Sequence, residues 1–170
     1  GKEVVTNFEN IKIRNICLND FPAVLKWSRD KRFCIANGWD INQDEKRLLQ
    51  WWEKWVNNKS DQFIRWGIDY NGSLVGYIDL VLLNGNGAEI GIAIGDSQLW
   101  SKGIGTYTLK LGIEKAEKDF GIQTFFAETH ETNFASRKML EKIGFTEISR
   151  KGEEQYLGAM TTLIQYKYSI

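Results

Sequence analysis

Apolar and polar residues alternate through the middle of the chain in a way that predicts β-strands. The alternation runs from Phe63 to Tyr70 and, after an Asn-Gly pair typical of a type I′ turn, from Ser73 to Leu83. Residues 84–87 alternate Asn and Gly, which predicts a second turn, and the strand pattern returns over residues 88–95. These three stretches are expected to form an antiparallel meander.

The apolar residues of the next segment recur at helical spacing instead. They are Leu109, Ile113, Ala116 and Phe120. Gly121 follows them as a stop signal, and residues 122–129 return to the strand pattern. Because a strand, helix, strand crossover places its two strands parallel, the strand at 122–129 is expected to lie parallel to that at 88–95.

The N-terminal third predicts one strand and two helices. Residues 11–18 are expected to form the strand, and Asp20 is expected to cap a first helix with a proline in its first turn. Asn42 and Glu45 have capping-box spacing ahead of a second, amphipathic helix. Residues 29–40, between the two helices, are expected to be a loop.

The C-terminal part predicts a short helix and two strands. Asn133 is expected to cap a helix that ends at Gly144, and residues 145–150 and 160–168 are expected to be strands around a turn at Gly152. The order of elements predicts an α/β fold with a mixed central sheet, of roughly six to seven strands, between helices.

Charge and composition narrow the possible functions. The 170 residues include 22 basic and 22 acidic ones, so no overall field favours nucleic acid or an anionic membrane, and the length suits a single domain over residues 1–170. Cys17 and Cys34 lack the spacing of metal ligands and are expected to be buried thiols, and no metal site is predicted. No apolar run has membrane-spanning length and no signal peptide precedes Val4, so a soluble cytoplasmic protein is expected.

The segment Gln98 to Thr106, QLWSKGIGT, joins the strand at 88–95 to the following helix. Glycines at such a junction let an anion approach the unpaired N–H groups of the first helical turn. The pattern of a P-loop is absent, and a dinucleotide fingerprint needs a third glycine where Thr108 stands. From the residues alone, Gly103 and Gly105 form either an anion-binding loop or a plain tight turn.

A second segment, Asn133 to Phe145, NFASRKMLEKIGF, adds to that loop. Together, the strand, the glycine turn, the helix and this segment resemble the GNAT superfamily of acetyl-CoA-dependent N-acetyltransferases. The resemblance covers residues 60–150 well and the N-terminal third loosely. Trp100, followed by Ser101 to Thr106, is similar to the RimJ/RimL branch. The residues that fit the family pattern in the second segment are Asn133, Ser136, Glu141, Lys142, Gly144 and Phe145.

The resemblance implies acetyl-CoA as co-substrate, bound where the two parallel strands splay apart. It assigns the pantetheine to the backbone of Ile92 and Ile94. It leaves Asn133 either as a contact of that arm or as a plain helix cap, and Arg137 either near phosphates or on a solvated helix face. The pyrophosphate is assigned to the backbone of Lys102, Gly103, Ile104, Gly105 and Thr106.

The resemblance also implies candidates for catalysis. Glu89 is the candidate base that takes a proton from the acceptor amine, the alternative being a solvent-facing residue at a strand start, and the N–H of Ala93 is the candidate oxyanion donor. Many family members carry a tyrosine where this chain has Leu140. The departing thiolate then takes its proton from water or from Ser136, or needs none. His130 is either a second candidate base or a surface residue.

The acceptor is predicted only as a class. Trp39 and Asp40 suit a cationic amine, although tryptophans at helical spacing also suit a core, and Asp79 points either into the same cleft or to water. With His130 these are the candidate substrate residues. The acceptor is either a protein N-terminal amine or a small cation such as an aminoglycoside or a polyamine. The alternative function is an acyl-CoA-binding protein without turnover. Pairing of edge strands makes a homodimer possible.

Overall fold

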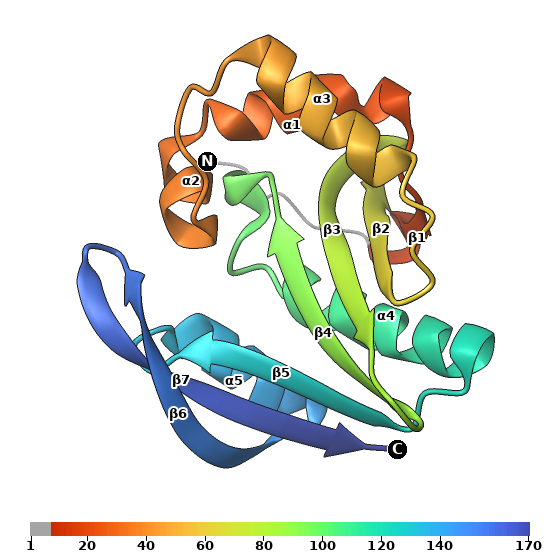
Figure 1. Cartoon of the computed structure of the whole chain (residues 1–170), viewed down its shortest axis with the longest axis vertical. Helices are drawn as coiled ribbons and strands as arrows, with labels where there is room; N and C mark the ends of the chain where they lie inside the picture. The colour runs from red at the N-terminus through yellow and green to blue at the C-terminus, as the bar shows by residue number, and fades with distance from the viewer. Residues whose placement is uncertain (1–7) are drawn as a thin grey trace.

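The computed structural model describes residues 8–170, and seven strands within them form one sheet in the order β1-β2-β3-β4-β5-β7-β6 (Figure 1). All neighbouring strands are antiparallel except β4 and β5, which are parallel. The mixed sheet, the meander and the parallel pair predicted from the sequence are therefore confirmed. The strands are β1 Ile11–Asn15, β2 Phe63–Tyr70, β3 Ser73–Leu82, β4 Gly87–Ile94, β5 Thr124–His130, β6 Thr146–Tyr156 and β7 Ala159–Ser169.

The ladder between β4 and β5 is short. It joins Gly87–Glu89 to Thr124–Phe126, and beyond these residues both strands continue without pairing to each other. Figure 1 shows β4 and β5 diverging from this point, so that the sheet opens as a V. The expected splay of the parallel pair is thus present.

Helices lie on both faces of the sheet. On one face, α4 and α5 bury apolar residues such as Leu109 and Leu140 against the main core cluster. On the other face, α1, α2 and α3 build a second cluster around Trp27 and Trp52. The helices are α1 Phe21–Ser28, α2 Lys31–Asn37, α3 Glu45–Val56, α4 Ile104–Phe120 and α5 Phe134–Ile143.

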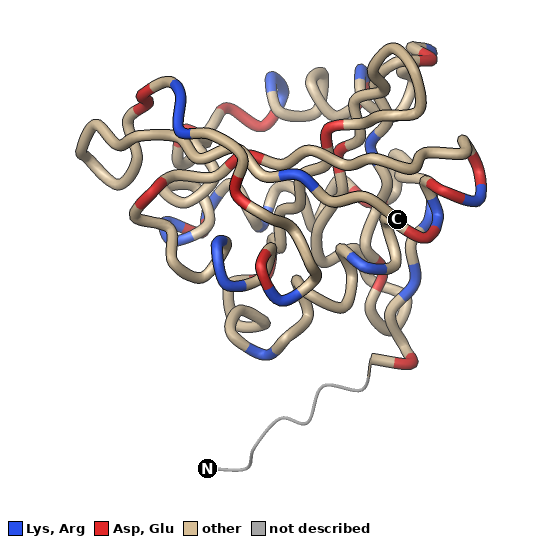
Figure 2. The backbone as a smooth tube through the Cα atoms, turned by 90° about the horizontal axis from the view of Figure 1, so that it is seen from below, with Lys and Arg blue, Asp and Glu red and all other residues tan. Residues whose placement is uncertain are grey.

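Charged residues do not segregate on the fold. Figure 2 shows basic and acidic residues interspersed along the backbone, in keeping with their equal numbers. None of the helices within residues 8–170 is long and apolar enough to cross a membrane. Any charge complementarity to a ligand must therefore be local.

Strand β4 alternates between the two cores, as its sequence predicts. Ile90 lies in the cluster under α4, whereas Ala93 lies in the cluster under α1 to α3. Gly95, at the end of the strand, lies against Trp27, and a Cβ atom there would come within 2.0 Å of the indole ring. Only glycine lets α1 pack this closely on the end of β4.

The expectation of a loop over residues 29–40 is wrong, because α2 forms there. The side chain of Asp30 caps α2 by accepting hydrogen bonds from the backbone N–H groups of Arg32 and Phe33. Gly38 ends the helix in the left-handed conformation. The helix is only two turns long, so its buried residues do not repeat often enough to show a period.

The expected cap of the second helix is also wrong. Asp44, not Asn42, caps α3, and its carboxylate accepts from the N–H of Arg47. Asn42 instead adopts a left-handed backbone and donates its N–H to the carbonyl of Ser28. Asp20 does precede α1, but its side chain makes no capping bond there.

The bounds of two strands and the burial of one cysteine differ from expectation. Strand β6 continues through Gly152, where a register shift accommodates its positive φ, and the turn falls at Leu157 and Gly158. Strand β1 is shorter than residues 11–18. Cys17 is exposed, and only Cys34 is the buried thiol that was expected.

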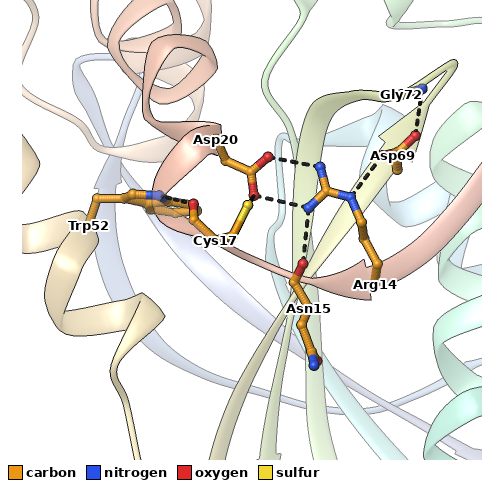
Figure 3. A network of polar contacts seen from close by, with 7 residues as sticks. All are labelled: Arg14, Asn15, Cys17, Asp20, Trp52, Asp69 and Gly72. Atoms are coloured by element: carbon orange, nitrogen blue, oxygen red, sulfur yellow. Dashed lines mark hydrogen bonds and ion pairs between the residues drawn. The ribbon is translucent and has the colours of Figure 1, made fainter.

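The Asp20 carboxylate takes part in a polar network that joins β1, β2 and α3 (Figure 3). It accepts two hydrogen bonds from Arg14, at 2.8 and 3.0 Å, and one from the N–H of Cys17. Arg14 also donates to Asp69 on β2. The indole of Trp52 on α3 donates to the carbonyl of Cys17, so the network fastens the N-terminal helices to the edge of the sheet.

Acid should weaken this network. Burial alone would raise the pKa of Asp20, but the hydrogen bonds from Arg14 and Cys17 outweigh it and hold the pKa below its ordinary value. Such a group contributes stability that is present above its unfolded pKa, near 3.9, and is lost as the pH falls through its folded pKa.

We expect Asp20→Asn to lower the free energy of unfolding by about 1–3 kcal/mol at pH 7, because Arg14 loses a charged partner. Urea denaturation at a series of pH values measures the difference between variant and wild type. That difference should shrink progressively below about pH 4. Asp61→Asn, an exposed acid in a loop, is the control and should change little. A difference that stays constant from pH 7 to acid would remove the Asp20 charge from the account.

Candidate active site

The loop between β4 and α4 presents a helix N-terminus that no side chain caps. Gly103 is the N-cap residue and has a φ of 79°, in the left-handed region that favours glycine. The N–H groups of the first turn are therefore free of a side-chain acceptor, which suits an anion. A cavity of about 410 Å³ opens over this turn, lined there by Ser101, Gly103, Ile104, Gly105 and Thr106.

Trp100 fixes this loop to the sheet. Its indole N–H donates to the carbonyl of Ile94 at 2.9 Å, and the Arg32 guanidinium lies 5.0 Å from its ring centroid. Trp100 lines the loop cavity while holding β4, α2 and the loop together.

A second cavity, of about 260 Å³, lies in the splay between β4 and β5. It shares its walls with the loop cavity, so the two form one cleft, which we call the splay cleft. The residues that line both cavities are Ala36, Ile92, Asn133, Ser136, Met139 and Tyr156. Asn133 caps α5 here, because its side-chain oxygen accepts from the N–H of Ser136 at 3.1 Å.

A third cavity continues the splay cleft onto the face that carries α1 to α3. It has a volume of about 560 Å³ and shares Ile90, Gly91, Ala127 and Glu128 with the cavity in the splay. We call it the acidic groove, because three carboxylates line it: Asp79, Glu89 and Glu128. A passage thus runs from the glycine loop, between the diverging strands, to Glu89.

Polar side chains line the acidic groove on both sides of Gly91. Asp79 pairs in register with Gly91, and a Cβ atom added to Gly91 would meet nothing within 4 Å. On the far side of the splay, Glu128 accepts from the Gln165 amide at 2.8 Å, and Gln165 in turn accepts from Ser149. Open space therefore lies over Gly91, between the carboxylate of β3 and that of β5.

Asp79 is not a free carboxylate. Arg65 donates to both of its oxygens, at 2.6 and 2.8 Å, and the Arg65 side chain is only 7% exposed. The guanidinium lies 4.1 Å from the ring centroids of both Trp55 and Tyr77, and the Nη1 group has no hydrogen-bond partner within residues 8–170. The aromatic faces stand in for that partner. The unpaired negative charge of the groove belongs to Glu89 and Glu128, which are both exposed.

Some candidate residues lie elsewhere. Trp39 and Asp40 line a separate cavity of about 230 Å³ beside Trp51, so they are not brought together with Glu89. Arg137 donates to the carbonyl of Glu131 and does not line the splay cleft, nor does Lys102.

Other candidates do lie at the cleft or beside it. Ala93 lines the loop cavity, and its side chain packs in the cluster under α1 to α3. His130 lines the splay, with its Nδ1 atom 2.8 Å from the Thr161 hydroxyl. Leu140 is buried at the same place and offers no proton. No group of three His, Cys, Asp or Glu side chains in the described part of the chain has a metal-binding arrangement.

The sequence reasoning missed three residues that shape these cavities. Glu89 pairs with Phe126, and Glu128 lies two residues further along β5, so Glu89 and Glu128 lie on the same face of the sheet. Only the register of β4 against β5 reveals this. The only sequence feature that pointed to a role for Arg65 is its position opposite Asp79 in the predicted hairpin. Tyr156 lies in the part of β6 that was expected to follow the strand, so nothing in the sequence directed it to the cleft.

Comparisons with known proteins agree with this architecture. Residues 10–146 match the family described as Acetyltransferase (GNAT) domain. The uncharacterised protein MJ1062 of Methanocaldococcus jannaschii is 29% identical in an alignment of 166 positions that covers 91% of this chain and 34% of that protein. The chain therefore spans about a third of the length of this relative.

Two solved structures share the fold at low identity. The microcin C7 self-immunity acetyltransferase MccE, in complex with acetyl-CoA and AMP, has a TM-score of 0.82 at 18% identity, covering 95% of this chain and 93% of that one. The spermidine N-acetyltransferase of Vibrio cholerae, with CoA and spermine, has a TM-score of 0.79 at 14% identity, covering 95% and 96%. The match over residues 10–146 carries the conclusion: this chain belongs to the GNAT acetyltransferase family.

Proposed function

We propose that this chain is an acetyl-CoA-dependent N-acetyltransferase of the RimJ/RimL-like branch, with residues 1–170 acting as one domain, and that its acceptor is a small cationic primary amine. One observation carries the proposal: the splay cleft connects an uncapped helix N-terminus to a groove with two exposed carboxylates. The two solved neighbours support this proposal, since one is a complex with acetyl-CoA and the other is a complex with CoA and spermine, a polyamine.

The loop cavity would hold the nucleotide end of acetyl-CoA. The N–H groups from Gly103 to Thr106 and the positive end of the α4 dipole suit the pyrophosphate. Ile92 and Ile94 line the cleft on the free edge of β4, where their backbone groups would bond to the pantetheine amides. Asn133 and Ser136 would flank the arm from α5.

The reaction would take place where the splay cleft meets the acidic groove. Acetyl-CoA would enter from the loop side and the amine from the Glu89 side. An alkylammonium is mostly protonated at neutral pH, so Glu89 would take its proton, directly or through water. The neutral amine then attacks the thioester carbonyl, and a backbone N–H on the free edge of β4 would donate to the developing oxyanion. Ala93 alternates with Ile92 and Ile94 and pairs with Tyr77, so its own N–H points toward β3 and does not suit this role.

The acidic groove favours an acceptor with more than one positive charge. One ammonium would be deprotonated near the thioester, and a second would remain charged and close to Glu89 or Glu128. Phe63, Phe126 and Ile148 provide apolar walls for the methylene chain between them. This combination suits a polyamine better than a protein N-terminus with its single charge.

We expect free CoA to appear fastest with diamines and polyamines. The sharpest comparison is 1,4-diaminobutane against n-butylamine, which differ mainly in the second ammonium. A thiol assay with acetyl-CoA should give a KM about tenfold lower for the diamine, and added salt should reduce that advantage because it screens exposed carboxylates.

The same assay includes aminoglycosides and short peptides with free N-termini. A higher rate with peptides than with any diamine would overturn the proposed acceptor class. Tight acetyl-CoA binding without CoA release across the whole panel would instead support a binding protein without turnover.

We expect Gly103→Val to weaken acetyl-CoA binding at least about tenfold, as measured by calorimetry, because the side chain crowds the phosphate approach and strains a left-handed residue. Gly85→Val is the matched control. Gly85 has nearly the same positive φ but lies in the turn between β3 and β4, away from the cleft. Equal affinities in the two variants would remove the loop from the cofactor site.

We expect Glu89→Gln to lower kcat about 100-fold at pH 7, because a carboxamide cannot accept the amine proton. The deficit should diminish as the pH approaches the amine pKa, near 10, where free amine is already present. A pH profile of kcat measures this recovery, with Glu114→Gln, an exposed acid on α4, as control. A deficit of the same size at every pH would assign Glu89 to binding rather than proton transfer.

A further inference from the structure

The thiolate of acetyl-CoA departs more easily when it gains a proton, and Leu140 of α5 cannot supply one. Leu140, where many family members have a tyrosine, is only 3% exposed and packs in the main core. Of the six residues that line both parts of the splay cleft, three have protic side chains, namely Asn133, Ser136 and Tyr156. A donor to the sulfur should be among these, because the pantetheine must pass this point to bring the thioester between the strands.

Tyr156 reaches the cleft from the opposite side to α5. It is the last residue of β6 and pairs with Ala159 across the hairpin turn. Its side chain lines the loop cavity beside Ser136 and the splay cavity beside His130. In Figure 1 the β6–β7 hairpin extends past the end of β5, which is how a C-terminal residue comes to lie at the cofactor site.

The Tyr156 ring is held in place by a parallel stack. Its centroid lies 4.5 Å from that of His130, with 9° between the ring planes. His130 is fixed in turn, because its Nδ1 atom lies 2.8 Å from the hydroxyl of the buried Thr161. A stack restrains the ring and leaves the phenolic hydroxyl free, and no side chain in residues 8–170 forms a hydrogen bond with it.

The chemistry of the three protic groups separates them. The Asn133 amide is no acid, and its oxygen is engaged in capping α5. A serine hydroxyl is a far weaker acid than a phenol, whose ordinary pKa is about 10. Partial burial raises the pKa of Tyr156, so the phenol keeps its proton at neutral pH and is available as a donor.

On the basis of the proposed function, we propose that Tyr156 is the group that donates to the sulfur of acetyl-CoA as the thioester breaks. The amine nitrogen forms a bond to the acetyl carbon, the carbon–sulfur bond breaks, and its electron pair goes to the sulfur. The sulfur takes the phenolic proton. The phenolate regains a proton, through water, from the nitrogen that becomes the amide, so no other reactant is needed.

Tyr156→Phe tests this directly, because it keeps the ring and its stack on His130 and removes only the hydroxyl. We expect kcat to fall about 10–100-fold, at or just below the lower end of the usual range for a general acid. The affinity for acetyl-CoA, measured by calorimetry, should stay within about twofold of wild type. Tyr168→Phe is the matched control, since Tyr168 packs on Phe145 and does not line the cleft; it should leave both values unchanged.

A second readout needs no turnover. If the Tyr156 hydroxyl bonds to the sulfur, the wild-type protein should bind CoA more tightly than desulfo-CoA, and Tyr156→Phe should abolish that preference. The preference can be measured even if no acceptor in the panel releases CoA, so failure of the proposed function would not be confused with failure of this inference.

Either of two results would overturn the assignment. One is a Tyr156→Phe variant that keeps at least half of the wild-type kcat and the full preference for CoA over desulfo-CoA. The other is a Ser136→Ala variant that shows the losses expected of Tyr156→Phe, which would move the donor to α5. A melting temperature near that of wild type in each variant ensures that the comparison concerns folded protein.

Discussion

The short parallel ladder between β4 and β5 is the constraint on which the site depends. Three residue pairs join the strands, and beyond Glu89 and Phe126 the facing edges of β4 and β5 form no hydrogen-bonded ladder with each other. Unpaired strand edges bind extended groups that carry amides, in the manner of an added strand. The pantetheine arm is such a group. The interruption of the sheet thus provides both the space and the hydrogen-bonding groups for the cofactor.

The splay persists because each strand is anchored separately. Strand β4 stays paired with β3 up to Ile94, and its end packs against Trp27 through the bare backbone of Gly95. Strand β5 pairs with β7 along its whole length, from Thr124 to His130. The two halves of the sheet therefore have their own partners, and each stays paired without the other beyond the short ladder.

Local signals predicted the parts of this arrangement that depend on single residues. Gly103 and Gly121 both adopt left-handed conformations, so they mark the two ends of α4 correctly. Where two residues close in sequence could both cap a helix, the sequence did not decide between them. Asp44 lies two residues from Asn42 and caps α3 in its place. Gly152 resembled a turn because glycine favours one, but a bulge in β6 accommodates it.

The parts that escaped prediction depend on contacts between distant segments. The acidic groove needs Glu128 to lie across the splay from Asp79, and the order of strands and their register decide this, not any local pattern. Tyr156 reaches the cleft only because the β6–β7 hairpin extends past the end of β5. The cofactor loop was predictable because its chemistry lies in one segment, whereas the acceptor side is assembled from six strands, β2 to β7.

The tryptophans of the N-terminal helices act on the acceptor side from a distance. Trp51 and Trp55 do not line the acidic groove; they enclose the guanidinium of Arg65 together with Tyr77. A buried guanidinium is stable only when it is paired, and Asp79 is its partner. The aromatic enclosure therefore fixes Asp79 and cancels its charge. The net charge presented to an acceptor is then set by Glu89 and Glu128 alone, one on each side of the splay.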